Sequence, residues 1–524
     1  MNYPVWEVPV IGTPWVVGMI AIFHVMISHF AVGGGAYLTL ALRKAYLGNH
    51  REWLPIIKQH SKFFLVVTGV FGTVSGVGIW FAIGLVNPSA TSALIHNFVF
   101  GWAIEWLFFL IEVTAILVLY YTWDRIPEKV ALNVSYVYAI SSILTLVIIN
   151  GILTFMLTPG HVWLQAAGTG NEPSVFWYAF FNPTYWPSLI MRMLVMMALA
   201  GVWALVSFSK LEQGKTRDQM IRWSTSWLIP AFLLLPIVFV WYRQMIPYAN
   251  RHLMELGMAT IGSGLFTQIT RIALISIMST ATIAAIAYFF AYKSPRDFTL
   301  GHAVSLLFIA LLATASTEYA REAIRKPYVI GSYMYSSGVR VKDVKHYQDT
   351  SYLAASMWRP DDTPPSLYEE GRFVFRGQCM GCHTIDGYRG IKGLTMARDD
   401  KSLNNVLLML REYKPDSPYH AFMPPLAAND QEIQALKVYL LTLNNKTIDT
   451  ANVFTSKPAP PDAKTAATTT PVPAGASAGT APAVASPAAP KSPGTLDVVP
   501  AKAAPPVAPT SAAAVPEAPA KSRT

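Results

Sequence analysis

The sequence is poor in charge and poor in cysteine. Asp, Glu, Lys and Arg make up only 13% of its 524 residues, whereas 53% are hydrophobic. So little charge lies well outside the usual range of soluble proteins, which excludes a soluble globular fold for most of the chain. Only two cysteines are present, both in the stretch FRGQCMGCHT at 375–384, so the rest of the chain has no thiol.

The apolar residues lie in continuous runs long enough to cross a bilayer, which takes about 20 residues of helix. Continuous runs favour helices over strands, because in lipid only a helix satisfies its backbone hydrogen bonds within one segment. We predict an all-α polytopic helix bundle. Its eight expected spans are 14–42, 63–86, 97–122, 133–158, 186–208, 226–242, 265–292 and 299–320.

Lys and Arg are distributed unevenly between the loops. The second and fourth loops have none, and the sixth has Arg243 and Arg251. The odd-numbered loops carry Arg43, Lys44, Arg51, Lys58, Lys62, Arg125, Lys129, Lys210, Lys215, Arg217, Arg222, Lys293 and Arg296. The odd loops are therefore expected on the cytoplasmic side, with the N-terminus and everything after the eighth span outside. The start of the chain has no positive n-region and no small-residue cleavage site, so the first span is expected to act as an uncleaved insertion signal.

The loop charges also explain much of the net charge of +10. A nucleic-acid partner is therefore not needed to account for it.

Charged residues return after residue 330. We divide this part into a linker at 331–365, a small soluble helical domain at 366–450, and a tail at 451–524. The segment DQEIQALKVYLLTL in the small domain repeats apolar residues at helical spacing. The tail consists mainly of Ala, Pro, Thr and Ser, and is predicted to be disordered because it cannot bury enough apolar surface.

The small domain contains the pattern CxxCH at 379–383, which is typical of covalent attachment of one haem c. The thiols of Cys379 and Cys382 would add to the two vinyl groups of the porphyrin, and His383 would ligate the iron. A redox dithiol or half of a zinc site is the alternative, but a zinc site needs more ligands nearby and a dithiol does not need the histidine.

A sixth iron ligand is expected from a methionine, which raises the reduction potential. Met423 in the sequence FMPP is the best candidate, while Met380 and Met396 are poorly placed alternatives. The segment GRFVFRGQCMGCHTIDG, the MPP loop and the closing helix together resemble a class I cytochrome c. The predicted topology agrees, because haem c is attached on the outer side of the bacterial cytoplasmic membrane.

Ionisable residues inside the spans are functional hypotheses by default. His24 is a candidate haem ligand, with His29 as a weaker one; the nearby run Gly33–Gly35 would admit a flat macrocycle, although helix packing explains it equally well. Glu105 and Glu112 lie two helical turns apart on nearly one face. They suggest a proton path or a haem-facing site, with interhelical hydrogen bonding as the alternative.

Four further charged residues lie near span ends, where snorkelling to the interface is a sufficient explanation. They are Arg192, Arg271, Glu318 and Glu322.

Residues 14–330 resemble the large subunit of the cytochrome bd oxygen reductases. The resemblance is carried by FH at 23–24, FGTVSGVGIWFAIG, the two glutamates followed by YYTWDR, LTLVIINGILTFMLTPG, and TEYAREAIRKPYVIG. It implies a transmembrane domain at 1–330 that binds haem b, haem d or both. His24 would ligate the high-spin haem and Glu322 its partner haem. Glu112 would be the proton-path glutamate and Glu105 its companion, although their spacing is one residue shorter than expected.

Two departures from that family concern how electrons arrive. The fifth span has no histidine for the low-spin haem, and Ala273 stands where its methionine is expected. The connection between the sixth and seventh spans is too short for the long external loop that takes part in quinol binding.

We therefore predict an oxygen reductase of the bacterial inner membrane that receives electrons from a periplasmic cytochrome donor through its haem c and reduces O2 to water. A second membrane subunit is an expected partner. One alternative is an electron relay without gas chemistry, in which His29, Met191 or Met193 supplies extra ligands. Another is a reductase for a different small molecule, such as nitric oxide.

Overall fold

The computed structural model describes residues 6–259, 268–356 and 366–445. Within these residues, eight helical segments are long and apolar enough to cross a membrane, so the predicted all-α multi-span fold is confirmed. The segments are Thr13–Leu47, Arg51–Val86, Pro88–Tyr121, Glu128–Phe155, Tyr185–Phe208, Lys215–Met245, Thr270–Lys293 and Leu300–Arg325. Each overlaps one predicted span, and the chain is a multi-pass membrane protein.

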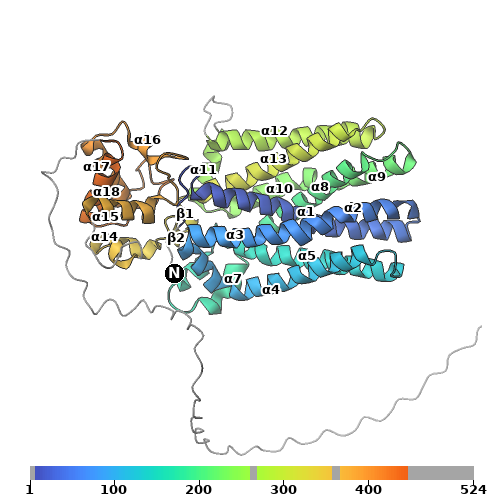
Figure 1. Ribbon diagram of the computed structural model, residues 1–524, viewed down its shortest axis with the longest axis horizontal. Coiled ribbons are helices and arrows are strands. Elements are labelled where there is room, and N and C mark those ends of the chain that lie inside the picture. The colour runs from blue at the N-terminus through green and yellow to red at the C-terminus, as the bar shows by residue number, and fades with distance from the viewer. Residues whose placement is uncertain (1–5, 260–267, 357–365, 446–524) are drawn as a thin grey trace, which may run out of the picture. The chain divides into compact units, whose positions relative to one another are not determined.

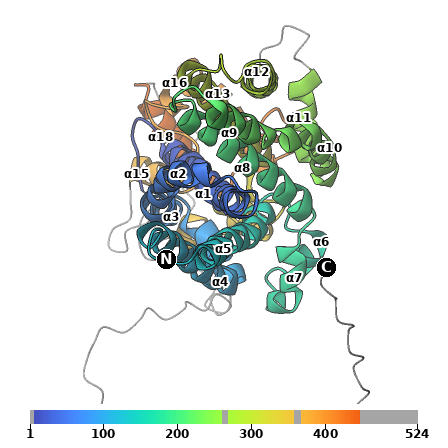
Figure 2. The ribbon, with the colours of Figure 1, turned by 90° about the vertical axis from the view of Figure 1, so that its right-hand side faces the viewer.

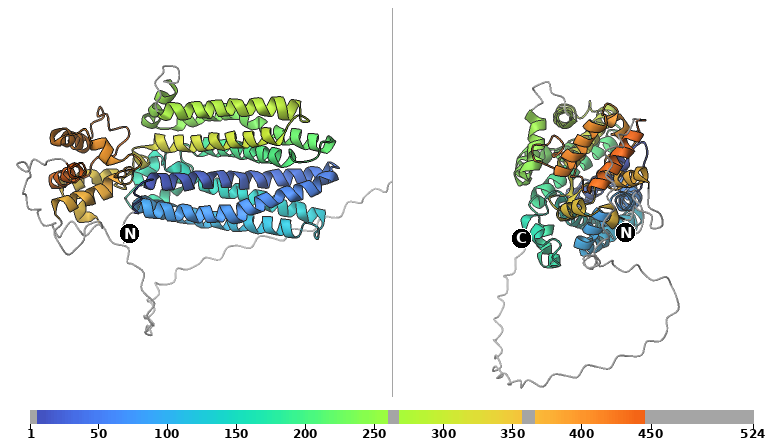
Figure 3. Two further views of the ribbon diagram at one scale, coloured as in Figure 1. Left: turned by 45° about the horizontal axis from the view of Figure 1, so that its top comes forward. Right: turned by 90° about the vertical axis from the view of Figure 1, so that its left-hand side faces the viewer.

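Some segments are single helices and others are interrupted. The first segment is the single helix α1 (Thr13–Leu47). The second is made of η1 (Arg51–Trp53), α2 (Leu54–Val66), η2 (Val67–Gly72) and α3 (Thr73–Val86). The third and fourth are the single helices α4 (Pro88–Tyr121) and α5 (Glu128–Phe155). The fifth segment is α8 (Tyr185–Phe208), and the sixth is made of α9 (Lys215–Ser226) and α10 (Ile229–Met245). The seventh is made of α12 (Gln268–Ile286) and η4 (Ala287–Lys293), and the eighth is α13 (Leu300–Arg325). Figure 1 shows the long helices running side by side, and the left view of Figure 3 shows α12 beside α13.

Since successive spans alternate in direction, α1 begins at the end of the bundle where α3, α5, α10 and α13 finish. We call this the Thr13 end. Contacts confirm the arrangement, because Leu157, Ile246 and Ile324, which follow α5 and α10 or close α13, form one buried cluster.

Local sequence signals set the ends of these helices. The Asn87 side chain accepts a hydrogen bond from the Ala90 amide at 3.1 Å, and Pro88 follows as the first residue of α4. Both features favour a helix start. At α13 the Thr299 hydroxyl accepts from the His302 amide at 3.4 Å. Helix α1 follows Gly12, whose φ of 81° lies in the left-handed region that glycine tolerates.

Helix α1 lies at the centre of the bundle, with α2, α5 and α8 around it in Figure 2. Its glycine run makes this packing possible. A Cβ on Gly33 would lie 2.2 Å from the Met196 carbonyl oxygen of α8, one on Gly34 would overlap the Phe64 ring at 2.2 Å, and one on Gly35 would lie 2.9 Å from Ser142 Oγ of α5. Close helix packing therefore accounts for the run.

Short elements connect or follow the spans at the Thr13 end. They are α6 (His161–Ala166), η3 (Glu172–Val175), α7 (Phe176–Phe180), α11 (Tyr248–Ala259) and an antiparallel pair of strands, β1 (Tyr328–Ile330) and β2 (Met334–Tyr335). The Gly331 amide donates to the Met156 carbonyl at 2.9 Å, which ties this hairpin to the end of α5.

The C-terminal part is a small helical domain. Its elements are η5 (Val341–Asp343), α14 (Val344–Asp349), η6 (Leu353–Ala355), α15 (Leu367–Val374), η7 (Phe375–Cys379), α16 (Ile391–Thr395), α17 (Asp400–Glu412) and α18 (Asp430–Thr442). Helices α15 and α18 cross closely, since a Cβ on Gly371 would lie 2.0 Å from the Ala435 carbonyl oxygen.

The described part of the predicted linker, 331–356, is folded. Leu353 lies in the core of the small domain, and the Glu432 carboxylate accepts hydrogen bonds from Ser351 Oγ at 2.6 Å and the Leu353 amide at 2.8 Å. The tail predicted at 451–524 lies outside the described residues.

Candidate functional site

The two cysteines and the histidine of the CxxCH pattern form one tight turn. Helix η7 ends at Cys379, and the amides of Cys382 and His383 both donate to the Cys379 carbonyl oxygen at 3.0 Å. Both cysteines are free and half-buried. The turn therefore presents two thiols and an imidazole within a few residues of each other.

The neighbours of His383 leave one ring nitrogen available for a metal. His383 Nδ1 lies 2.9 Å from the Arg389 carbonyl oxygen, so Nδ1 carries the proton and donates it. Burial lowers the pKa of His383, although the bond to Arg389 acts in the opposite direction. A neutral imidazole with Nε2 free is the form that ligates haem iron.

The surroundings of the cysteines do not favour the two alternative roles, a redox dithiol and a zinc site. Burial, with a smaller effect of Cys382, raises the pKa of Cys379 to about 12. Such a thiol is a poor nucleophile, whereas a redox dithiol needs an accessible thiolate. Among the residues that the structure describes, no cluster of three His, Cys, Asp or Glu side chains could hold a metal ion such as zinc. The residues present fit a covalently bound haem.

The three methionines named as iron ligands differ in their surroundings. Met423 is half-buried and packs against the same core cluster as Cys379, whereas Met396 is 62% exposed. Met380 is buried, and its carbonyl oxygen accepts a hydrogen bond from Thr13 Oγ1 at 3.1 Å. Of the three, Met423 has the surroundings that a buried sixth ligand requires.

The residue before Cys379 was not singled out from the sequence. Gln378 is buried, its Nε2 donates to the Ala427 carbonyl at 2.8 Å, and its Oε1 accepts from the Ala427 amide at 2.9 Å. This paired bond joins the cysteine turn to the loop that follows Met423. Only the fold brings residues 49 positions apart together, so no local pattern indicates it.

The cysteine turn also contacts the membrane part of the chain. The Tyr388 amide donates to the Val10 carbonyl at 2.9 Å, and Cys382 Sγ lies 3.9 Å from Ser336 Oγ. The Trp15 ring at the start of α1 lies between two tyrosines, 5.6 Å from the Tyr388 ring and 6.2 Å from the Tyr319 ring of α13, measured between centroids.

In the bundle, His24 faces α3. Ser75 Oγ donates to the Phe71 carbonyl at 2.5 Å, so it accepts from His24 Nδ1, which lies 2.9 Å away. This leaves His24 Nε2 free to ligate a metal. Gly76 leaves room beside the ring, because a Cβ there would lie 3.3 Å from His24 Cε1. These residues fit a haem held by His24.

Glu105 and Glu112 have different surroundings on α4. Glu112 is 2% exposed, and its Oε1 has no hydrogen-bond partner among the described residues. Glu105 is half-buried. A buried carboxyl oxygen without a partner asks for an explanation such as bound water or a proton-exchanging role.

Glu322 lies at the end of α13, away from the contacts of His24. Arg325 Nη2 donates to its carboxylate at 2.5 Å, Lys326 Nζ lies 3.7 Å away, and the side chain is 43% exposed. The two predicted membrane haem ligands, His24 and Glu322, therefore contact different residues.

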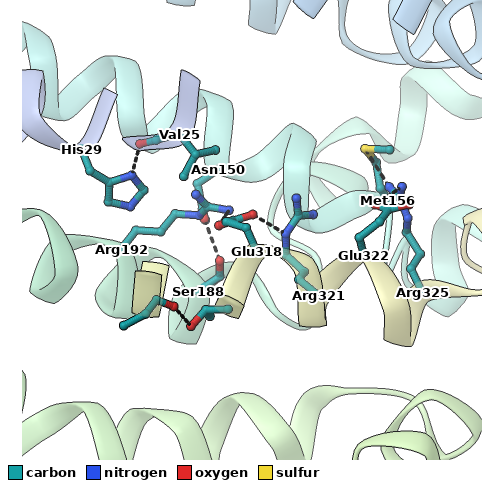
Figure 4. Close-up of polar contacts among 12 residues, drawn as sticks. Val25, His29, Asn150, Met156, Ser188, Arg192, Glu318, Arg321, Glu322 and Arg325 are labelled. Atoms are coloured by element: carbon teal, nitrogen blue, oxygen red, sulfur yellow. Dashed lines mark hydrogen bonds and ion pairs between the residues drawn. The ribbon is translucent and has the colours of Figure 1, made fainter. Parts of the chain in front are cut away.

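Two residues that snorkelling was expected to explain are instead paired with each other, Arg192 buried and Glu318 half-buried, as Figure 4 shows. Arg192 of α8 is 8% exposed, and its Nη2 lies 3.7 Å from Glu318 Oε1 of α13. Arg321 Nε donates to Glu318 Oε2 at 2.9 Å. The snorkelling interpretation is wrong for Arg192 and Glu318, whereas Arg271 is exposed. A signal in the sequence could have indicated this pair, because Arg192 and Glu318 have opposite charges and lie equally far from the same end of the bundle.

Comparison with known proteins finds a match for the membrane part. Residues 14–261 match the family model described as cytochrome bd terminal oxidase subunit I. The structure of bd oxidase from Geobacillus thermodenitrificans is similar, with a TM-score of 0.52 and 15% sequence identity over 62% of this chain and 88% of that chain. At this identity the likeness shows a shared fold. The comparison with curated proteins found no match.

Proposed function

We propose that this protein is a terminal oxygen reductase whose electrons arrive through a covalent haem c, because residues 14–261 match the family model described as cytochrome bd terminal oxidase subunit I. The observation that carries the haem c assignment is the turn at 379–383, with His383 Nδ1 held by the Arg389 carbonyl and Nε2 left free. The haem c would supply a one-electron carrier outside the membrane.

In this proposal Cys379 and Cys382 anchor haem c, His383 and Met423 hold its iron, and Gln378 keeps the Met423 loop beside the cysteine turn. The contacts of that turn with Val10, Thr13 and Ser336 support electron transfer from this domain into the bundle. The donor would be a periplasmic cytochrome.

Within the bundle, His24 and Glu322 would hold the irons of membrane haems of b or d type, which supply the site of oxygen reduction. Ser75 orients the His24 ring through its hydrogen bond to Nδ1. Glu112 would hold and pass protons in an apolar surrounding, with Glu105 two turns away on the same helix. A second membrane subunit would complete the enzyme in the bacterial inner membrane.

The first test is the carbon monoxide difference spectrum of the dithionite-reduced, detergent-purified protein. A shift in the absorbance of a non-covalent haem is expected, because an oxygen reductase needs an open iron position. If all haems are present and none shifts, the protein is an electron relay and the oxygen-reductase proposal fails.

The His24→Ala variant assigns the site. It is expected to lose the carbon monoxide response while keeping the haem c absorbance. His60→Gln is the matched control, because His60 is a buried histidine whose Nδ1, like that of His24, bonds a serine hydroxyl, Ser207 Oγ at 2.9 Å. Normal carbon monoxide binding in His24→Ala would overturn the ligand assignment.

A further inference from the structure

A row of charges of both signs follows the last two turns of α13 and reaches across to α8. It consists of Arg192, Glu318, Arg321, Glu322, Arg325 and Lys326, and we call it the α13 charge ladder. Figure 4 shows most of it in one view, with Arg192 approaching Glu318 from the neighbouring helix. The contacts along the ladder run from the interior of the bundle to its Thr13 end.

Opposite charges of the ladder form two sets of close contacts, one around Glu318 and one around Glu322. Arg192 Nη2 lies 3.7 Å from Glu318, Arg321 Nε donates to Glu318 at 2.9 Å, and Arg325 Nη2 donates to Glu322 at 2.5 Å. Glu318 and Glu322 are one helical turn apart, which places them on the same face of α13 about 6 Å from each other along the axis.

The ladder carries more positive than negative charge. Its cations are Arg192, Arg321, Arg325 and Lys326, and its anions are Glu318 and Glu322. The Nε atoms of Arg192 and Arg325 have no hydrogen-bond partner among the described residues. Arg192 is only 8% exposed, so its charge is held where water screens it little. Burying a charge that is not fully paired is costly, and inside a membrane such residues are functional hypotheses.

We propose that the α13 charge ladder raises the reduction potential of the membrane haem whose iron Glu322 holds, with Arg192 and Glu318 acting in opposite directions. The inference rests on the proposed function, because it needs that haem. Reduction adds one electron to the ferric iron and gives the ferrous form. A nearby positive charge stabilises the added electron, and a nearby carboxylate opposes it. Excess positive charge therefore draws electrons toward the site where they are used.

The test is a potentiometric titration of the purified holoprotein, followed by the absorbance of each haem. Arg192→Leu is expected to lower the potential of the membrane haem, and Glu318→Gln is expected to raise it. One unit charge about 12 Å away at an effective dielectric constant of about 20 changes the ratio of reduced to oxidised haem about tenfold, or about 59 mV for one electron. The double variant Arg192→Leu/Glu318→Gln is expected to lie between the single variants.

Two controls distinguish a local electrostatic effect from a general disturbance of the fold. The haem c potential is expected to stay unchanged in all variants. Arg217→Leu is the matched control, because Arg217 is a buried arginine at the opposite end of the bundle, where it donates to the carbonyls of Pro295 and Phe298. It is expected to leave the membrane haem potential unchanged.

A purely structural pair gives a different pattern. If Arg192→Leu and Glu318→Gln shift the potential in the same direction, or leave it unchanged, the inference is overturned. If Arg192→Leu loses the haem, two other variants test the inference. Glu318→Gln is expected to raise the potential of the membrane haem, and the charge-preserving Arg192→Lys is expected to leave it unchanged. The proposed function fails separately, if the wild-type protein holds no non-covalent haem or if Glu322→Ala retains every membrane haem with unaltered spectra.

Discussion

Hydrogen bonds to one ring nitrogen decide what the histidines of this protein can do. His24, His29 and His383 each have Nδ1 next to an oxygen, which is Ser75 Oγ at 2.9 Å, the Val25 carbonyl at 2.6 Å and the Arg389 carbonyl at 2.9 Å. In each case the proton is held on Nδ1 and Nε2 is left as a lone-pair donor. Residue type suggested haem ligands, and the neighbouring oxygen makes the ring suitable.

At the residue scale, the sixth ligand of the proposed haem c can be tested with two methionines. Met423→Ala is expected to remove the absorbance that arises from sulfur bound to ferric iron and to lower the haem c potential, because a methionine ligand raises it. Met396→Ala is the control, since Met396 is 62% exposed, and it is expected to change neither property. An unchanged spectrum in Met423→Ala would show that another residue is the ligand.

Helix α1 serves several neighbours because its faces differ. His24 points to α3 through Ser75, Gly33 lies against α8, and Gly35 lies against α5. His24 and His29 are five residues apart, so at 3.6 residues per turn they face different directions. One helix therefore supplies both a candidate haem ligand and the close contacts that hold its position.

At the element scale, the glycine contacts predict a difference between two similar substitutions in α1. Gly33→Ala is expected to destabilise the bundle by about 1–3 kcal/mol, because its Cβ would lie 2.2 Å from a backbone oxygen that cannot move freely. Gly18→Ala is expected to stabilise it slightly, since nothing lies within 4 Å and alanine favours a helix. Thermal unfolding in detergent measures both, and equal melting temperatures for the two variants would contradict this packing.

At the scale of the whole molecule, sequence-distant segments meet at the cysteine turn. Tyr388 bonds to Val10 there, and Ser336 contacts Cys382. Trp15 extends these contacts to Tyr319 of α13, which is next to Glu318 in the charge ladder. The aromatic rings form a continuous set of contacts between the small domain and the bundle.

If the proposed haem c is present, this arrangement predicts a role for Trp15 in electron transfer between it and the membrane haems. In Trp15→Leu, flash photolysis or stopped-flow reduction is expected to show slower transfer with both haem spectra unchanged, because the aromatic contact is lost. Trp6→Leu is the control, since Trp6 lies in the same N-terminal segment but is 44% exposed. A wild-type transfer rate in Trp15→Leu would remove Trp15 from the path.

The sequence by itself determined the eight spans and the motif at 379–383. Long apolar runs and a fixed cysteine spacing are local signals, and each acts within one segment of chain. The fold decided which side chains meet: Gln378 with Ala427, His24 with Ser75, and Arg192 with Glu318. These partners lie on different elements, and helix direction, depth and rotation set their distances. From the sequence alone, snorkelling was a sufficient explanation for Arg192. Its pairing with Glu318 became evident only in the folded structure, because a contact between two helices produces no periodic pattern in the sequence of either helix.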